Sequence, residues 1–232
     1  MSILLQIQSV SGPDSLVQAA ESGVEKLSLL ELMLKGGPVM IPIAILSVIA
    51  IYIFIERYLA IRKAAREEKN FMNQIRDFVY SGNIDAAKAL CRNSESPIAK
   101  MIDKGLSRIG KSLRDIGTSV ENVGKLEIYS LEKNLATLAT IAGAAPMIGF
   151  LGTVTGMIRA FYNMSKAGNN IDVGLLSGGI YEAMVTTMAG LAVGIVAYLG
   201  YNILVAMVEK VVYKMEARSL EFIDLLQEPA KV

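Results

Sequence analysis

Three long stretches of apolar residues constrain what this 232-residue chain can fold into. They cover residues 39–55, 135–158 and 173–208, and Glu182 is the only charged residue in them. A helix needs roughly 20 apolar residues to cross a hydrocarbon core about 30 Å thick. Because 53% of the residues are hydrophobic and 19% are charged, the sequence predicts an integral membrane protein with three transmembrane helices.

The second and third stretches are longer than a bilayer is thick, so we expect their helices to tilt or to project into water. No strand pattern interrupts the helical spacing elsewhere, and the predicted fold class is therefore all-α, with long helices that project into a helical cytoplasmic region. The expected segments are an outer (periplasmic) amphipathic helix over 1–35, spans over 36–61, 135–162 and 174–208, a cytoplasmic helical region over 62–134, a periplasmic loop over 163–173, and a cytoplasmic C-terminal helix over 209–232.

The segments outside the spans carry helix start and stop signals. Residues 14–34 have apolar positions at helical spacing and a Ser28 to Glu31 capping box, which indicate an amphipathic helix lying on membrane lipid. The region 62–133 is broken near 82–83, 94–97 and 110–117 by glycine, serine and proline. Ser96 and Pro97 are typical of an N-cap and a first helical residue.

Positive charge is distributed unequally between the segments that separate the spans. Eighteen Lys and Arg lie in residues 62–133 and after residue 209, whereas only Lys26, Lys35 and Lys166 lie in the N-terminal segment and the 163–173 loop. Cytoplasmic segments are enriched in Lys and Arg. The pattern predicts that residues 62–133 and the C-terminus lie in the cytoplasm, and that the N-terminus and the 163–173 loop lie on the far side of the membrane.

The composition excludes several classes of function. The chain has no histidine and a single cysteine, Cys91, so it offers neither a Ser-His-Asp or Cys-His catalytic site nor a metal site built on these ligands. A net charge of +1 does not provide the basic surface that nucleic-acid binding requires. We therefore expect no enzyme activity, no cofactor and no nucleic-acid partner.

Small residues recur every three or four positions along the second and third spans, including Gly149, Gly152, Gly156, Gly190 and Gly194. Such stripes allow two helices to approach closely in a membrane. Tight packing of the helical hairpin explains the stripes on its own, and pore lining is the alternative.

Glu182 lies nine residues into the third apolar stretch. An ionised carboxylate inside a membrane costs about 3 kcal/mol by insertion scales, so it requires a partner or a function. Loss of hydration favours the neutral acid, which brings proton uptake and release within reach of physiological pH. We expect its counter-charge or proton partner to come from another polypeptide, and Arg159 to serve an interface near the outer end of the second span.

Three threonines are candidates for a proton pathway with Glu182. The hydroxyls of Thr153, Thr186 and Thr187 can each donate and accept a hydrogen bond, although threonines in helices also bond their own backbone. On an ideal helix Thr186 lies about 40° from Glu182 and Thr187 about 140° away. Helical geometry thus favours Thr186 as the neighbour of Glu182.

The membrane segments resemble the MotA/TolQ/ExbB proton channel family, and in particular its ExbB branch. The resemblance rests on APMIGFLGTVTGM over 145–157, GIYEAM over 179–184, and the positions Thr187, Gly190-Leu191-Ala192 and Tyr201-Asn202. It extends over most of the chain from Leu29 onward.

The resemblance implies a homopentamer around two helices of an ExbD-like single-span protein, with Glu182, Thr153 and Thr187 lining the pore. It implies a proton-channel subunit of a motor in the bacterial inner (cytoplasmic) membrane, with its N-terminus in the periplasm and its C-terminus in the cytoplasm. This motor would use proton motive force, through a TonB-like protein, for import across the outer membrane. Family and helical geometry thus differ over Thr186 and Thr187. A TolQ-like subunit, a gliding-motor stator and a passive scaffold are alternatives.

Overall fold

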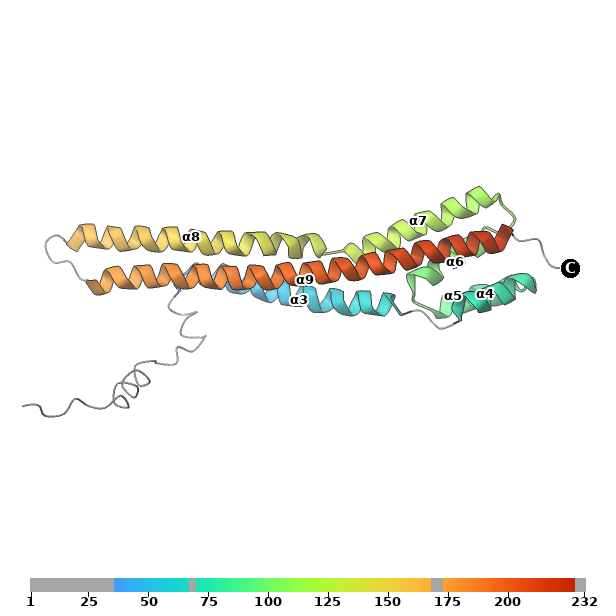
Figure 1. Ribbon diagram of the computed structural model, residues 1–232, viewed down its shortest axis with the longest axis horizontal. Coiled ribbons are helices and arrows are strands. Elements are labelled where there is room, and N and C mark those ends of the chain that lie inside the picture. Colours follow the sequence, from blue (N-terminus) through green and yellow to red (C-terminus); the bar gives the residue numbers. More distant parts are fainter. Residues whose placement is uncertain (1–35, 67–69, 168–172, 228–232) are drawn as a thin grey trace, which may run out of the picture.

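The computed structural model describes residues 36–66, 70–167 and 173–227, and all regular structure in this part of the chain is helical. The seven helices are α3 (Met40–Ala64), α4 (Phe71–Tyr80), α5 (Ile84–Asn93), α6 (Pro97–Leu106), α7 (Leu113–Glu132), α8 (Leu135–Ala167) and α9 (Val173–Gln227). In Figure 1, α8 and α9 form a long antiparallel hairpin, α3 lies along it, and α4–α7 gather at one end. The predicted amphipathic helix over 14–34 lies outside the described residues.

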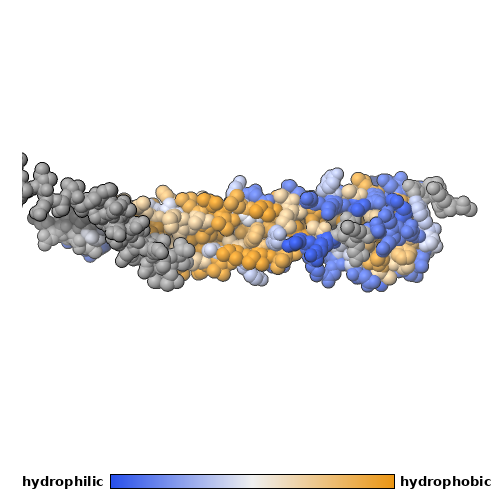
Figure 2. All heavy atoms as spheres, turned by 60° about the horizontal axis from the view of Figure 1, so that its bottom comes forward, coloured by the Kyte–Doolittle hydropathy of each residue, from blue (hydrophilic) through white to orange (hydrophobic). Residues whose placement is uncertain are grey.

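Three regions are long and apolar enough to cross a membrane, and they confirm the predicted all-α membrane fold. They are Met40–Ala64, Leu113–Lys166, which includes α8, and Leu176–Gln227 of α9. Large apolar side chains such as Val48, Phe150 and Ile195 are exposed on these helices. In Figure 2 the middle of the rod is covered by hydrophobic residues, whereas hydrophilic residues gather at the end that carries α4–α7. Lipid would cover such an apolar belt.

The helix of the third span does not end where the apolar residues end. Helix α9 continues without a break to Gln227, so the separate C-terminal helix predicted after residue 208 is part of it. Its last turns enter the bundle formed by α4–α7, where Phe222 is fully buried and packs against Gly105. Apolar burial on Phe222 and Leu225 replaces the membrane as the environment that stabilises this end of the helix.

The bundle of α4–α7 follows most of the predicted breaks. Helix α4 ends before Gly82, and Pro97 is the first residue of α6 after the N-cap Ser96. The Ser96 hydroxyl makes no capping hydrogen bond. Helix α7 already begins at Leu113, so Gly117, which we expected in a break, lies within it. Helix α8 likewise continues to Ala167 and includes residues 163–167, which the sequence placed in a loop.

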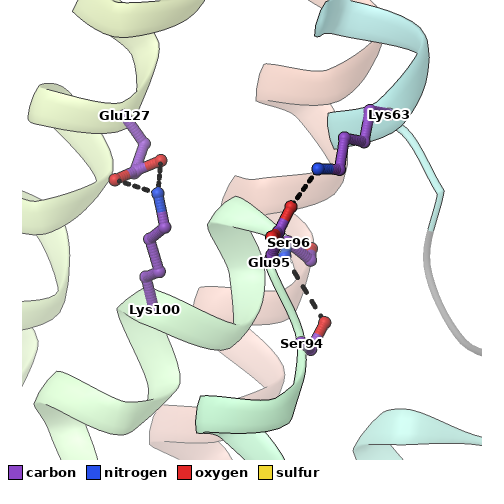
Figure 3. Close-up of polar contacts among 6 residues, drawn as sticks. All are labelled: Lys63, Ser94, Glu95, Ser96, Lys100 and Glu127. Atoms are coloured by element: carbon purple, nitrogen blue, oxygen red, sulfur yellow. Dashed lines mark hydrogen bonds and ion pairs between the residues drawn. The ribbon is translucent and has the colours of Figure 1, made fainter.

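One ion pair connects the bundle to helix α3, and another connects two helices within the bundle. Lys63 at the end of α3 pairs with Glu95 between α5 and α6, and Lys100 of α6 pairs with Glu127 of α7 at 2.8 Å (Figure 3). Exposed pairs of this kind contribute at most about 1 kcal/mol each, so they orient the helices more than they stabilise them.

The junction between α7 and α8 is held by a buried arginine. Asn134 has a positive φ of 64°, which interrupts the helix between the two elements. Arg57 of α3 is 8% exposed, and its Nη1 donates a hydrogen bond of 3.2 Å to the Ser130 carbonyl just before the junction. Its Nη2 pairs with Glu56. The guanidinium therefore connects α3 to the point where the chain turns from the bundle into the hairpin.

Candidate functional site

Glu182 lies on α9 and forms an ion pair with Arg159 of α8. The distance from Arg159 Nη1 to Glu182 Oε1 is 3.0 Å, and the two side chains are 54% and 22% exposed respectively. This chain therefore supplies a counter-charge to Glu182 from Arg159, the residue that we expected to serve an interface near the outer end of the second span. Gly156 packs directly on Ala183, and this hairpin register brings residue 159, nearly one turn further along α8, beside Glu182.

The turn that leads into α3 lies against the same carboxylate. Gly37 has a φ of +67°, and a Cβ atom added to it would lie 1.9 Å from Glu182 Oε1. A Cβ on Gly36 would lie 3.4 Å from Val185, one turn along α9. Only glycine combines this backbone conformation with such close contact. Glu182 is thus enclosed between α8 and the start of α3.

Thr153 and Thr187 form a second polar pair on the hairpin. Their hydroxyls are hydrogen-bonded to each other across α8 and α9. Thr187 Oγ1 also lies 3.1 Å from the Gly149 carbonyl oxygen, and Thr153 Oγ1 lies 3.3 Å from the Ala183 carbonyl oxygen. Because each hydroxyl has one hydrogen, the two hydroxyl hydrogens are shared among these three contacts. Four oxygen atoms from two helices lie together here, namely the two threonine hydroxyls and the carbonyls of Gly149 and Ala183. Ala183 is the residue that follows Glu182 in the chain.

Thr186 occupies a different environment. It is 1% exposed, and its hydroxyl donates to the Ala183 carbonyl of its own helix at 2.9 Å. A Cβ on Gly152 would lie 2.4 Å from the Thr186 hydroxyl oxygen, so this side chain fills the space that the glycine leaves. Helical geometry favoured Thr186 because it considers one helix only. In the structure that direction faces α8 rather than Glu182.

The predicted glycines bring the backbones of α8 and α9 into contact. A Cβ on Gly190 would lie 2.6 Å from the Ala145 carbonyl oxygen, and one on Gly149 would lie 2.9 Å from the Thr186 carbonyl oxygen. Gly194 faces Pro146 in the same way, at 2.5 Å. This proximity allows threonine hydroxyls on one helix to reach carbonyls of the other.

Two groups near Glu182 were not singled out by the sequence analysis as neighbours of this acid. Gly37 is 145 residues away in the chain, and no local pattern connects it to residue 182. The Tyr181 hydroxyl is buried and has no hydrogen-bond partner among the described residues. Gly37 carries no motif, because its role comes from its contact with α9. Tyr181 lies within the GIYEAM segment, but that segment does not indicate that its hydroxyl is buried.

The site contains a carboxylate, a guanidinium and two hydroxyls, which suit proton exchange and hydrogen-bond relay. Across the described residues, no cluster of three or more His, Cys, Asp or Glu side chains could hold a metal ion. The structure joins Glu182 to Arg159 and Thr153 to Thr187. No hydrogen bond between these two pairs is present in the described part of the chain.

Comparisons with known proteins agree with this chemistry. The chain is 26% identical over 190 residues to a putative biopolymer transport protein ExbB homolog of Methanothermobacter thermautotrophicus, covering 82% of this chain and 67% of that protein. It is 29% identical over 181 residues to an ExbB-like protein of Synechocystis, covering 77% and 71%. It is 41% identical over 76 residues, 33% of each chain, to the Tol-Pal system protein TolQ of Haemophilus influenzae.

The sequence model of the MotA/TolQ/ExbB proton channel family matches residues 93–217, more than half of the chain. The matched region contains α8, most of α9, and all the residues of the Glu182–Arg159 and Thr153–Thr187 pairs. This chain therefore belongs to the MotA/TolQ/ExbB proton channel family.

Proposed function

We propose that this chain is the proton-conducting subunit of an inner-membrane motor that uses proton motive force for TonB-dependent import across the outer membrane. The observation that carries the proposal is the position of Glu182. It is the only acidic residue of the second and third spans, and it contacts two other elements of the fold. A carboxyl group that alternates between charged and neutral forms can couple proton position to conformation.

The polar pairs are arranged in succession along α9. Thr187 is five residues beyond Glu182, which corresponds to about 7.5 Å along the helix axis. With the N-terminus in the periplasm and the C-terminus in the cytoplasm, as the distribution of Lys and Arg favours, a proton released by Glu182 meets the Thr153–Thr187 pair on its way inward. These hydroxyls would pass it on by exchanging hydrogen bonds. Thr186, whose hydroxyl bonds its own helix, is the less favoured candidate.

The free energy released by protons crossing the membrane is large enough to drive a conformational step. One elementary charge that crosses about 100 mV releases about 2.3 kcal/mol. A few protons therefore supply enough free energy to bias a conformational step of about 1–3 kcal/mol, the usual size of an allosteric coupling. The work would pass to an ExbD-like single-span partner inside a homopentamer, and from there to a TonB-like protein.

The test is the Glu182→Gln substitution, which preserves shape but cannot titrate. Glu209→Gln is the matched control, because Glu209 is an exposed acid on the same helix. We expect the Glu182 variant to assemble with its partner and to lose import driven by the proton gradient, while the control keeps it. Undiminished import at normal protein levels would refute the proposal. Loss of assembly would instead support a passive scaffold in which Glu182 serves only to hold the subunits.

A TolQ-like role is the second candidate, and the identity with TolQ of Haemophilus influenzae over 76 residues favours it. The same membrane chemistry would then drive a different partner, and a gliding-motor stator would be built alike. Identification of the protein that copurifies with the chain, and of its outer domain, distinguishes these roles.

A further inference from the structure

Only one partner of the ion pair between Arg159 and Glu182 can change its charge. A guanidinium stays protonated at any physiological pH, so only Glu182 can gain or lose a proton in this pair. Arg159 Nη1 lies 3.0 Å from Glu182 Oε1, and the guanidinium therefore contacts an oxygen atom that an incoming proton would bind. Access to that oxygen depends on whether Arg159 is in place.

The two side chains of the ion pair differ in their exposure, and this difference decides which of them can leave the pair. Arg159 is 54% exposed and Glu182 is 22% exposed. A long arginine side chain can extend along a helix and place its charge in water at the membrane surface. Arg159 can therefore move away from the pair, whereas Glu182 is held by its surroundings.

The second contact on Glu182 fixes its position. Gly37 lies so close that a Cβ atom there would be 1.9 Å from Glu182 Oε1. This turn contributes backbone and no charged side chain among the described residues. Arg159 is thus the charged group that the structure places against the carboxylate, and the turn at residues 36–38 restricts where that carboxylate can go.

We propose that Arg159 is a positioning residue for proton transfer, which together with the turn at residues 36–38 holds the Glu182 carboxylate in a closed position until a proton displaces the guanidinium. The proton adds to a carboxylate oxygen of Glu182, the ion pair breaks, and the guanidinium turns to water. When Glu182 releases the proton inward, the pair forms again. This inference rests on the proposed role of Glu182 and adds how its resting state is set.

The experiment measures how often Glu182 carries a proton, by its reaction with dicyclohexylcarbodiimide, which attacks protonated carboxyl groups in apolar surroundings. Membranes with the full-length chain and its native partners are treated at neutral pH, and the modified fraction of the peptide containing Glu182 is followed by mass spectrometry. We expect Arg159→Gln to react several-fold faster, because the guanidinium no longer occupies the carboxylate oxygen that it contacts at 3.0 Å. Arg159→Lys should restore slow reaction.

Lys166→Gln is the matched control, because it removes a positive charge from the same end of α8, where Lys166 lies over the Tyr162 ring. It should react like the wild type. Gly37→Ala provides a second perturbation that leaves Arg159 unchanged, and it should also speed the reaction by displacing Glu182. Wild-type kinetics in Arg159→Gln overturn the proposal, and if that variant fails to accumulate, wild-type kinetics in Gly37→Ala do so.

Failure of this inference can be separated from failure of the proposed function. If Glu182→Gln abolishes import but Arg159→Gln leaves the labelling rate unchanged, the proton role stands and the positioning role falls. If Glu182→Gln still imports, the proposed function itself fails, whatever the labelling shows.

Discussion

The closest backbone contact between α8 and α9 can be tested by adding one methyl group at Gly190. A Cβ there would lie 2.6 Å from the Ala145 carbonyl oxygen and 2.8 Å from Gly149 Cα. Ordinary van der Waals contact begins at 3.4 Å, so Gly190→Ala requires a local separation of about 0.8 Å, the difference between 3.4 and 2.6 Å. Both neighbours are backbone atoms and cannot rotate away.

Such a separation of α8 and α9 would also lengthen the hydrogen bonds of the Thr153–Thr187 pair. The hydrogen bond from Thr187 to the Gly149 carbonyl is 3.1 Å long. An added 0.8 Å takes it to about 3.9 Å, beyond the range of a hydrogen bond. Overpacking costs about 1–3 kcal/mol, and the lost hydrogen bond about 1 kcal/mol more.

The assay compares Gly190→Ala with Gly178→Ala on the same helix, where an added Cβ has no atom within 4 Å. Both changes give the same gain in helix propensity, so their difference isolates the contact. We expect the thermal unfolding midpoint of purified Gly190→Ala to lie several degrees below that of the control, and its proton-driven import to fall. Equal midpoints and equal import would show that the hairpin does not require this close approach.

Two further predictions concern the part of the molecule outside the hairpin. Burial raises the pKa of the Cys91 thiol to about 12, and the charge of Asp103 is a second cause. Below pH 9 the thiol of the folded protein should therefore react with iodoacetamide about a thousandfold more slowly than that of the unfolded chain. Similar rates would contradict this burial. The same shift makes the folded state lose stability as the pH rises from 9 to 12, because the unfolded thiol ionises first. Replacement of Arg57 by Met should lower the free energy of unfolding, measured by chemical denaturation, by about 1–3 kcal/mol, because the Ser130 carbonyl loses its buried donor. The control is Arg62→Met, at an exposed position of the same helix, which should change this free energy little.

Prediction from sequence succeeded for properties that depend on one segment at a time. The three apolar stretches, the all-helical fold and the start of α6 at Pro97 each follow from local composition. The end of helix α9 could not be predicted in this way. Apolar residues become scarcer after residue 208, yet α9 continues because Phe222 and Leu225 are buried by other helices.

The site shows the same division between local and long-range information. Glu182 stands out in the sequence because a lone carboxylate among apolar residues is costly wherever its helix packs. Its neighbours depend on the rotation and depth of separate helices, and a helical wheel contains neither quantity. For this reason Thr186, which the wheel favoured, bonds its own helix, while Thr187 bonds Thr153.

The sequence by itself determined that this chain has three membrane-spanning helices and a single acid within their apolar stretches, because hydrophobicity and charge are properties of each residue. The tertiary structure alone decided that Arg159 and Gly37 contact that acid and that α9 reaches into the bundle of α4–α7. These contacts join positions up to 145 residues apart. The Arg159 contact is set by the register in which glycines let α8 and α9 approach, and the others by the packing of α3 and of the bundle on α9. No single segment encodes these relations.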